Sequence, residues 1–472
     1  MISLTLATIA DIVGGRLVLT ETTDGDTVIS GVSDTDSRKI TPGDIFFAKP
    51  GEVTDGHRFA GKVVENGAAL VIGERECDVE VPQIIVANTV RALGDLATEV
   101  VSRVRALGRM RVVAVTGSNG KTTTKNLLRS MFAEVGDVVA PIASFNNEVG
   151  APTTFLRVTE TTDTLVAEMG ASRIGEIRSL TQMARPDVGI VLGVGLAHAG
   201  EFGGIDRVEV AKREMVEALP QDGVAVLNAD DARVVRMQSA APGRIVWFGR
   251  SERADVRATE VQVAADGTRF LLHVPGEQPV GVHFPVIGEH HVMNALAASA
   301  AAWVEGVPIT TIVRVLESTT LAERGRMEVV HAGSVTVIND AYNANPNSMA
   351  AALRTLAQIA APGQRTIAVL GSMSELGEFS VAEHQRIGEL AVRLRLSRTC
   401  VVGEDARPLY LAAVAEGSWD DEAVFFADAD EAFTAISEQL RPGDVVLVKS
   451  SNSAGLLALG DRLGEYAKGL DA

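Results

Sequence analysis

The chain has 472 residues and a formal net charge of −18. At about 150 residues per domain, this length predicts roughly three domains rather than one core. The acidic balance argues against a nucleic-acid partner and against an anionic membrane surface, because both require an excess of Lys and Arg. The only two cysteines, Cys77 and Cys400, exclude a disulfide framework and favour a reducing compartment.

The N-terminal segment MISLTLATIADIVGG has no basic residue before its apolar stretch, so it is not expected to be a signal peptide. No run of about 18 apolar residues occurs anywhere, which argues against a membrane span. We therefore expect a soluble cytoplasmic protein. The acidic surface fits a monomer as well as a dimer, and a monomer is our expectation.

Residues 1–108 are expected to form a small α/β unit. Its strand-like apolar runs, at 44–48, 68–73 and 82–87, are separated by polar, turn-rich segments.

Residues 109–322 are expected to form a second unit, because strand-like and helical segments alternate along it. This alternation predicts a mostly parallel sheet with helices on its faces. The stretch 122–135 has apolar residues at helical spacing, and residues 255–287 resemble an antiparallel hairpin added to the sheet. The Ala-rich stretch 290–307 predicts a buried helix.

Residues 323–472 are expected to form a third unit. Five strand candidates recur there, VTVIND, TIAVLG, TCVVG, AVFFA and DVVLVKS, with helical segments between most of them. The pattern is typical of a doubly wound, Rossmann-like domain. The fold class is therefore predicted to be α/β, with three domains.

The strongest local signal is a loop between a predicted strand and a predicted helix, with a Gly-Lys-Thr sequence at its end. Its glycines allow the backbone to approach phosphate oxygens, its N–H groups form an anion cradle, and its Lys and first Thr can serve the outer phosphates and Mg²⁺. The usual glycine five residues before the Gly-Lys pair is Val115 here. The alternative is a Gly-rich turn with a solvated lysine. We expect an ATP-binding loop made of Gly117, Ser118, Asn119, Gly120, Lys121, Thr122 and Thr123.

Three further residues of the second unit are candidate metal-site residues. Glu168 ends a strand-like run, where ligands gather in open α/β sheets, but it could equally be a capping or surface acid. His198 follows an apolar run, where a lone His is more often a structural hydrogen-bonding residue. Lys212 lies in a helical stretch and on spacing alone is a plain solvated lysine.

Ordered motifs along nearly the whole chain resemble the Mur ligase family, the ATP-dependent amide ligases of bacterial cell-wall synthesis. One such match is weak, whereas many in the right order are specific. They are TGSNGKTTTK (116–125), SFNNEVGAP (144–152), AEMGAS (167–172), LAHAGEFG (196–203), VAKREM (210–215), LNADD (227–231), GEHHVMNALAA (288–298), GRMEV (325–329), INDAYNANPNSM (338–349), GSMSELGEFS (371–380) and LVKSSNSAG (447–455).

The resemblance implies a three-domain ligase whose first domain holds the UDP-sugar nucleotide and whose second domain binds ATP. The third domain would close over both and bring the amino substrate. Three of these motifs, SFNNEVGAP, INDAYNANPNSM and SELGEFS, are similar to those of the member that joins D-alanyl-D-alanine to UDP-N-acetylmuramoyl-tripeptide through an acyl phosphate. The member that adds the third residue is the alternative, although the DNPR motif of its diaminopimelate-adding form is absent. Whether the third residue of the acceptor is lysine or diaminopimelate stays open.

The resemblance also implies roles for individual residues. Lys121 and Thr122 would serve the triphosphate and Mg²⁺, while Glu168 and His198 would hold a second Mg²⁺. Lys212 would be carbamylated, which turns a cation into a carboxylate-bearing metal support. The nucleotide would also meet Asn294, Arg326 and Asp340. The uridine side of the UDP-sugar substrate would meet a first turn of Thr35, Asp36, Ser37 and Arg38 and a second turn that carries Asp55 and His57. The other residues expected to contact substrates are Asn146, Asn147, Tyr342, Asn343, Asn345 and Lys449.

The sequence departs from the family pattern at two positions. His291 replaces the Asn common in the GxHNxxN pattern, and Asn452 stands where a KxSR-type motif usually has Arg. The first change leaves the adenine contact open, and the second requires another cation, such as Lys449, for the group that the Arg would meet.

Two other functions remain compatible with the phosphate loop. Folylpolyglutamate synthase also forms amides through acyl phosphates, but it usually lacks a first domain of this size. A P-loop ATPase switch would hydrolyse ATP without an amino acceptor. Through the resemblance alone, the third α/β domain and the set of Glu168, His198 and Lys212 argue against a non-enzymatic nucleotide-binding scaffold.

Overall fold

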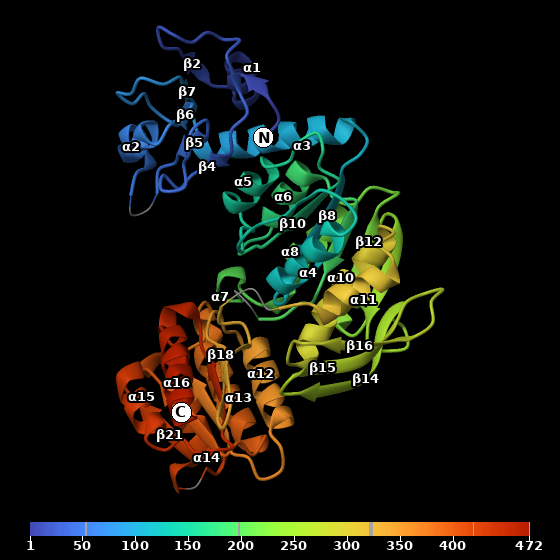
Figure 1. The fold of residues 1–472 in the computed structure, drawn as a ribbon, viewed down its shortest axis with the longest axis vertical. Helices are drawn as coiled ribbons and strands as arrows, with labels where there is room; N and C mark the ends of the chain where they lie inside the picture. The colour runs from blue at the N-terminus through green and yellow to red at the C-terminus, as the bar shows by residue number, and fades with distance from the viewer. Residues whose placement is uncertain (52–53, 197–198, 321–323, 419, 472) are drawn as a thin grey trace.

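The computed structural model describes residues 1–472 except 52–53, 197–198, 321–323, 419 and 472. The chain forms three successive α/β units, and the central unit lies between the N-terminal and the C-terminal ones (Figure 1). In the part of the chain that is described, no helix is both long enough and apolar enough to cross a membrane.

The first unit contains a five-stranded sheet in the order β2-β7-β6-β5-β4, in which only β2 is antiparallel to its neighbour. A separate antiparallel pair joins β1 to β3. The strands are β1 (Leu4–Thr5), β2 (Arg16–Val18), β3 (Val28–Ile29), β4 (Ser33–Asp34), β5 (Ile45–Ala48), β6 (Leu70–Gly73) and β7 (Gln83–Ile85). The helices are α1 (Leu6–Val13), α2 (Ala60–Glu65) and α3 (Thr89–Ala106).

The apolar runs of the first unit form the strands that the sequence predicts. The three predicted runs correspond to β5, β6 and β7. Every residue of β5 and β6 is buried. A continuous apolar run of this kind is what a parallel strand needs when both of its faces are covered.

Helix α3 joins the first unit to the second. It begins after Asn88, whose side chain accepts a hydrogen bond from the backbone N–H of Arg91, and it packs against α1 on one side and α5 and α6 on the other. One cluster of buried side chains runs from the first unit into the central unit. Arg105 of α3 also makes a bidentate ion pair with Asp187 of the central unit, at 2.8 and 2.9 Å. The two units therefore share a core.

The central unit is built on a nine-stranded sheet in the order β16-β15-β14-β13-β12-β11-β8-β10-β9. Its strands are β8 (Arg111–Thr116), β9 (Val138–Val139), β10 (Thr164–Glu168), β11 (Val188–Val191), β12 (Val224–Asn228), β13 (Arg244–Gly249), β14 (Val256–Ala264), β15 (Gly267–His273) and β16 (Val280–Phe284). The helices are α4 (Lys121–Ala133), α5 (Gly150–Phe155), α6 (Glu176–Ala184), α7 (Ala199–Phe202), α8 (Ile205–Glu217), α9 (Ala232–Arg236), α10 (Glu289–Val304) and α11 (Ile309–Glu317).

The central sheet matches the predicted pattern and extends it by two edge strands, β9 and β16. From β9 to β14 all neighbouring strands are parallel, and β14 turns back as the predicted antiparallel hairpin with β15. A third antiparallel strand, β16, completes this edge. The predicted Ala-rich helix is α10, which packs against β12, β13 and β14 and against α4. Its small side chains allow this close packing.

The C-terminal unit has a six-stranded sheet in the order β17-β18-β22-β19-β20-β21, parallel except for β17. All five predicted strands are present, and β17 is an additional edge strand. The strands are β17 (Glu328–Ala332), β18 (Thr336–Asp340), β19 (Thr366–Leu370), β20 (Arg398–Val402), β21 (Ala423–Phe426) and β22 (Val445–Lys449). The helices are α12 (Pro346–Ile359), α13 (Ser380–Arg393), α14 (Arg407–Glu416), α15 (Ala429–Ser437) and α16 (Leu457–Leu470).

The carboxyl ends of two parallel sheets meet between the central and C-terminal units. In the central sheet, β8 and β10 end side by side, with Glu168 in register with Val115. In the C-terminal sheet, β18 and β22 end with Asp340 in register with Lys449. Residues from both edges line one cavity. Ligands of open α/β sheets bind at such edges, so the fold places the candidate site at this junction.

Candidate active site

The loop between β8 and α4 has the geometry of an anion cradle. The strand ends at Thr116 and the helix begins at Lys121, so the chain turns within residues 117–120. Gly120 has a left-handed φ of +82°, and a Cβ atom there would lie 2.1 Å from Oδ1 of Asn294. Glycine alone avoids both the strain and the clash. The free N–H groups of the first turn of α4 can therefore face an anion.

The side chains of the loop lie where the sequence predicts a phosphate site. Lys121 Nζ donates to the carbonyl oxygen of Gly117 at 2.7 Å, and burial lowers the pKa of this ammonium. Ser118 Oγ accepts a hydrogen bond from the N–H of Gly195 at 2.8 Å, which ties the loop to the segment after β11. Thr123 is 9% exposed and lines the same cavity as Lys121.

Glu168 and its neighbours form a buried oxygen-rich cluster beside the loop. Thr122 Oγ1 donates to Glu168 Oε1 at 3.3 Å and lies 3.1 Å from Ser144 Oγ. Asn146 Nδ2 donates to the same carboxylate oxygen at 2.8 Å. The second oxygen, Oε2, is buried and has no hydrogen-bond partner among the described residues. A buried carboxylate oxygen without a partner is costly, so this atom points to a missing ligand.

Lys212 lies on α8 and is only 3% exposed. Burial, assisted by the nearby ammonium of Lys121, lowers the pKa of Lys212 to about 7. The predicted metal residue His198 lies outside the described residues. Among the residues that are described, no three His, Cys, Asp or Glu side chains are grouped as a metal site.

The phosphate loop opens into a cavity of about 360 Å³ between the central and C-terminal units. It contains most of the residues predicted for the nucleotide, together with others that the sequence did not single out. Its lining residues are Ser118, Asn119, Gly120, Lys121, Thr122, Thr123, Ser144, Asn146, Glu168, His290, His291, Asn294, Arg326, Asp340, Tyr342, Asn343, Ser348 and Lys449.

The first turns of α10 supply one wall of this cavity. Asn294 is 7% exposed and contacts the Gly120 turn. His291, one helical turn earlier, is 5% exposed, and neither of its ring nitrogens has a partner among the described residues. Burial lowers the pKa of His291 well below its ordinary value, so the ring is neutral at pH 7. The departure from the family pattern at His291 therefore lies in the cavity wall.

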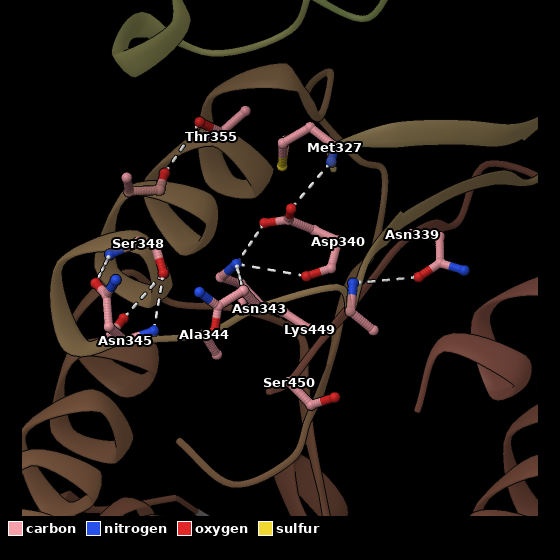
Figure 2. Close-up of polar contacts among 12 residues, drawn as sticks. Met327, Asn339, Asp340, Asn343, Ala344, Asn345, Ser348, Thr355, Lys449 and Ser450 are labelled. Carbon is pink, nitrogen blue, oxygen red and sulfur yellow. Dashed lines mark hydrogen bonds and ion pairs between the residues drawn. The ribbon is translucent and has the colours of Figure 1, made fainter. Parts of the chain in front are cut away.

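The C-terminal unit supplies the opposite wall, where Asp340 and Lys449 form an ion pair. Lys449 Nζ lies 2.6 Å from Asp340 Oδ2 and donates to the carbonyl oxygen of Asn343 at 3.0 Å (Figure 2). The other oxygen of Asp340 accepts from the N–H of Met327 at 3.0 Å. The Lys449 side chain is 2% exposed, so its charge is already neutralised inside the protein. Asn452, the second departure, is exposed at the start of a 3-10 turn.

Two contacts join the walls across the junction. The guanidinium of Arg326 lies 4.3 Å from the ring centroid of Tyr342, and its Nη2 donates to Ser144 Oγ at 3.4 Å. Asn119 Nδ2 of the phosphate loop donates to Oδ1 of Asn345 at 3.3 Å, and the Asn345 amide donates back. Asn345 also caps α12, with the N–H of Ser348 donating to its side chain (Figure 2).

A second cavity, of about 400 Å³, adjoins the first and shares Lys121 and Asn146 with it. It contains Asn147, which was predicted to contact substrate and which also accepts hydrogen bonds from the N–H groups of Val149 and Gly150. The other lining residues are Glu148, Gly170, Ala171, Ser172, Arg173, Glu176, Ser179, Leu180, Met183, Glu201 and Glu375.

The predicted uridine-side residues lie in the first unit and line neither cavity. The turn of Thr35, Asp36, Ser37 and Arg38 directly follows β4. Asp36 accepts hydrogen bonds from the backbone and the guanidinium of the exposed Arg38, and this contact lowers the pKa of Asp36 to about 2. The next residue, Lys39, places its Nζ 4.9 Å from the ring centroid of Phe145, beside the loop that carries Asn146.

Asp55 and His57 form a packed pair in the second predicted turn. Nδ1 of His57 lies 2.6 Å from Asp55 Oδ1, while Nε2 accepts a hydrogen bond from the N–H of Glu74 at 2.9 Å. His57 is 6% exposed, and both ring nitrogens are occupied by the fold itself. Hydrogen bonds from Arg75 and His57 hold the pKa of Asp55 well below its usual range.

The sequence thus identifies most residues of the first cavity but misses Ser144 there, and it misses Arg173, Glu176 and Glu375 of the second cavity. Ser144 and Glu375 lie within motifs that were recognised, yet neither was singled out. Arg173 and Glu176 follow the recognised AEMGAS motif. The signal that could have identified Arg173 and Glu176 is their position shortly after a motif that begins at a strand end.

Comparison with known families confirms the resemblance. Three family models match consecutive parts of the chain: "Mur ligase family, catalytic domain" over residues 29–112, "Mur ligase middle domain" over 115–302, and "Mur ligase, glutamate ligase domain" over 325–452.

Similar proteins agree over nearly the full length. The UDP-N-acetylmuramoyl-tripeptide--D-alanyl-D-alanine ligase of Mycobacterium tuberculosis is 42% identical, with 98% of each chain covered. The ligase of the same name from Escherichia coli is 35% identical, with 97% of each chain covered.

Solved structures agree as well. The crystal structure of MurF from Acinetobacter baumannii has a TM-score of 0.87 and 32% identity, covering 98% of this chain and 99% of that one. MurF ligase from Thermotoga maritima, in complex with ADP, has a TM-score of 0.80 and 26% identity, covering 93% and 99%. The chain belongs to the Mur ligase family. It is therefore an enzyme of the ligase class.

Proposed function

We propose that this chain joins D-alanyl-D-alanine to UDP-N-acetylmuramoyl-tripeptide in an ATP-dependent reaction. The observation that carries the proposal is a pair of adjoining cavities that share Lys121. Such an arrangement suits a reaction in which one substrate is activated by phosphoryl transfer and is then attacked by a second substrate. The relatives that are 42% and 35% identical bear the name of this activity. A ligase for the third residue is similar at only 18% identity, which speaks for a shared fold alone.

We further propose the biosynthetic step, the oligomeric state and the domain roles that the sequence led us to expect. The reaction would be the last cytoplasmic step of peptidoglycan precursor peptide assembly, carried out by a monomer. Residues 1–108, 109–322 and 323–472 would be the UDP-sugar, ATP and closing ligase domains. Asp36, Arg38 and the residues around Asp55 would receive the UDP-sugar end.

The first cavity is proposed to bind ATP, with its triphosphate on the 117–123 loop. Lys121 and the N–H groups of α4 would hold the outer phosphates and offset their charge. The nucleoside would extend toward Asn294, Arg326 and Asp340, which line the same cavity.

The cluster around Glu168 fits Mg²⁺. Its partnerless oxygen Oε2 and the nearby Thr122 hydroxyl are hard oxygen ligands of the kind that Mg²⁺ prefers, and Mg²⁺ usually adds phosphate and water to few protein ligands. Two ions are expected: Thr122 would serve the first, and Glu168 with His198 would hold the second, supported by carbamylated Lys212. Bound Mg²⁺ would neutralise charge on the transferred phosphoryl group.

Lys212 is proposed to be carbamylated. Only an unprotonated amine attacks carbon dioxide, and a pKa of about 7 leaves a large fraction of this lysine unprotonated at neutral pH. The product carries a negative group in place of a cation. This charge would suit a metal-supporting residue next to the ammonium of Lys121.

In the proposed reaction the tripeptide carboxylate attacks the γ-phosphate, which gives an acyl phosphate and ADP. The amine of D-alanyl-D-alanine then attacks the acyl carbon, and phosphate leaves. Two anions meet in the first step, and Lys121 with the loop amides offsets their repulsion. Residues of the C-terminal unit line both cavities, so its docking would exclude water from the acyl phosphate.

The product itself tests this proposal. The purified protein, incubated with ATP, Mg²⁺, D-alanyl-D-alanine and UDP-N-acetylmuramoyl-tripeptide, should yield a UDP-linked pentapeptide whose mass exceeds that of the acceptor by one dipeptide residue. Parallel reactions with lysine and diaminopimelate acceptors would identify the third residue. A product formed from a single amino acid, with the dipeptide ignored, would point instead to another ligase of the family.

A further inference from the structure

Glu375 is the residue through which the C-terminal unit reaches into the second cavity. All other residues described as lining this cavity belong to the central unit. This cavity adjoins the first one and shares Lys121 with it, so under the proposed function it offers a place for the attacking amine beside the activated carboxyl group. Glu375 therefore lies on the side from which an amino substrate would approach.

The backbone of Glu375 is held in an unusual conformation. Its φ of +63° lies in the left-handed region, which is strained for a residue other than glycine. The carbonyl oxygen of Glu375 accepts a hydrogen bond from the N–H of Gly200 at 3.1 Å, across the junction of the two units. A Cβ atom on Gly200 would lie 2.6 Å from the nitrogen of Gly377, so this approach requires glycine.

The loop that carries Glu375 is also fixed to its own unit. The N–H of Met373 donates to Nε2 of His384 at 2.9 Å, and the N–H of Ser374 donates to Oγ of Ser451 at 2.8 Å. Leu376, the next residue after Glu375, is 1% exposed. Contacts on both sides thus present an exposed carboxylate from a rigid loop.

The charge of the cavity suits a cation. Besides Glu375 it is lined by Glu148, Glu176 and Glu201, against the cations Lys121 and Arg173. A peptide α-amino group has a pKa of about 8 and arrives at neutral pH as ammonium. Hydrogen bonds between ammonium and carboxylate are the strong, charge-assisted kind.

We propose that Glu375 binds the ammonium group of the incoming amino substrate and directs its nitrogen toward the acyl carbon beside Lys121. This inference rests on the proposed function. In the ligation step the C–N bond forms as the bond between the acyl carbon and the phosphate oxygen breaks. Of the two protons that the ammonium loses, one leaves on hydrogen phosphate and the other passes to water. Glu375 would thus set the affinity for the amine, not the formation of the acyl phosphate.

Three variants distinguish the effect of the Glu375 carboxylate from the effect of its backbone conformation. Glu375→Gln removes the charge and keeps the shape. Glu375→Gly removes the side chain and relieves the left-handed strain, so the loop should keep its conformation. Glu378→Gln is the matched control, because Glu378 is exposed in the same segment, loses the same charge and does not line the cavity.

The experiment compares two nucleophiles. Steady-state assays with ATP and UDP-N-acetylmuramoyl-tripeptide should show that both Glu375 variants raise KM for D-alanyl-D-alanine about tenfold or more, as loss of a charge-assisted hydrogen bond implies. KM for ATP should not change. Hydroxylamine, which is largely unprotonated at neutral pH, traps the acyl phosphate as a hydroxamate. The Glu375 variants should form this hydroxamate at the same rate as the unaltered enzyme and Glu378→Gln.

Two results would overturn the inference while leaving the proposed function intact. One is an unchanged KM for D-alanyl-D-alanine in Glu375→Gln. The other is a parallel fall in hydroxamate formation, which would mean that the side chain supports the acyl-phosphate step or the fold. If the unaltered enzyme showed no turnover dependent on the dipeptide, the proposed function and this inference would fail together.

Discussion

Lys121 links sequence to chemistry at the scale of a single residue. The Gly-Lys-Thr sequence predicts its role, and the structure places it in the wall shared by the two cavities. Its ammonium donates to the Gly117 carbonyl oxygen at 2.7 Å, which holds it over the loop. The first prediction concerns this charge.

Lys121→Ala should lower kcat by about 10²–10⁴-fold, because an aligned cation is lost from the site of developing phosphate charge. Thermal unfolding should change little, because the lost ammonium is desolvated and, within the part of the chain that the structure describes, donates only to the carbonyl oxygen of Gly117. Turnover within a few-fold of the unaltered enzyme would contradict the role given to Lys121.

Lys212 provides a prediction on pH dependence. Its pKa is lowered from an ordinary value of 10.5 to about 7, which corresponds to at most about 5 kcal/mol. In solution free of carbon dioxide, the unfolded chain binds more protons than the folded one between about pH 7 and pH 10.5. Stability should therefore rise with pH through this window and be constant below it, as far as Lys212 contributes.

Urea unfolding at pH 7 and pH 9 measures this contribution when Lys212→Met is compared with the unaltered chain. The difference in unfolding free energy between the two chains should shrink as the pH rises. Added bicarbonate should weaken the pH dependence of the unaltered chain alone. Equal pH dependence in both chains would mean that Lys212 is not buried as an amine.

His57 shows what a sequence cannot reveal at this scale. The turn of Asp55 and His57 was recognised, and a substrate contact was predicted from it. In the structure, Nε2 of His57 receives the N–H of Glu74, seventeen positions away. Sequence spacing does not reveal such a partner, so the internal use of this ring could not have been foreseen.

At the scale of elements, the phosphate loop depends on the conformation of Gly120. Two glycines have nearly the same left-handed φ, +82° at Gly120 and +79° at Gly108. A Cβ atom at Gly120 would collide with Asn294, whereas one at Gly108 would meet no atom within 4 Å. Substituting alanine at each of these two glycines therefore separates the effect of backbone strain from the effect of the collision with Asn294.

Gly120→Ala should therefore lose nucleotide binding, while Gly108→Ala should lose only about 1 kcal/mol of stability. Titration with a fluorescent ATP analogue reports the first effect and urea unfolding the second. Comparable nucleotide affinity in the two variants would show that the loop tolerates a displaced Asn294.

Strand prediction from the sequence was most successful where all residues of a strand are buried. Fully buried parallel strands such as β5, β10 and β22 are continuous apolar runs, and the sequence identified them. None of the strands that it missed is fully buried: these are β1 to β4 in the first unit and the edge strands β9, β16 and β17. Their weaker apolar signal is the physical reason why they were not predicted.

At the scale of the whole molecule, the order of the three units was predictable but their junction was not. The order of the family motifs along the chain predicts the order of the three units. The amide pair between Asn119 and Asn345 joins residues 226 positions apart, and no local pattern in either segment predicts the contact. This pair connects the phosphate loop directly to the C-terminal unit.

Asn345 has two functions that can be separated by substitution. Asn345→Ala removes both the cap of α12 and the contact with Asn119, and should cost about 1 kcal/mol of stability as well as activity. Asn345→Ser can still cap the helix but is too short to pair with the amide, so it should keep stability and lose turnover. Thermal unfolding and steady-state kinetics together test this. Full activity in Asn345→Ser would show that the pair does not support closure.

The central claim is that ATP cleavage by this chain is coupled to the joining of two peptide substrates. Its most direct test is phosphate release from ATP by the purified protein, with UDP-N-acetylmuramoyl-tripeptide and D-alanyl-D-alanine present together and with each omitted in turn. We predict sustained release only when both are present. Release at the same rate without either substrate would contradict the account and indicate an ATPase with a different purpose.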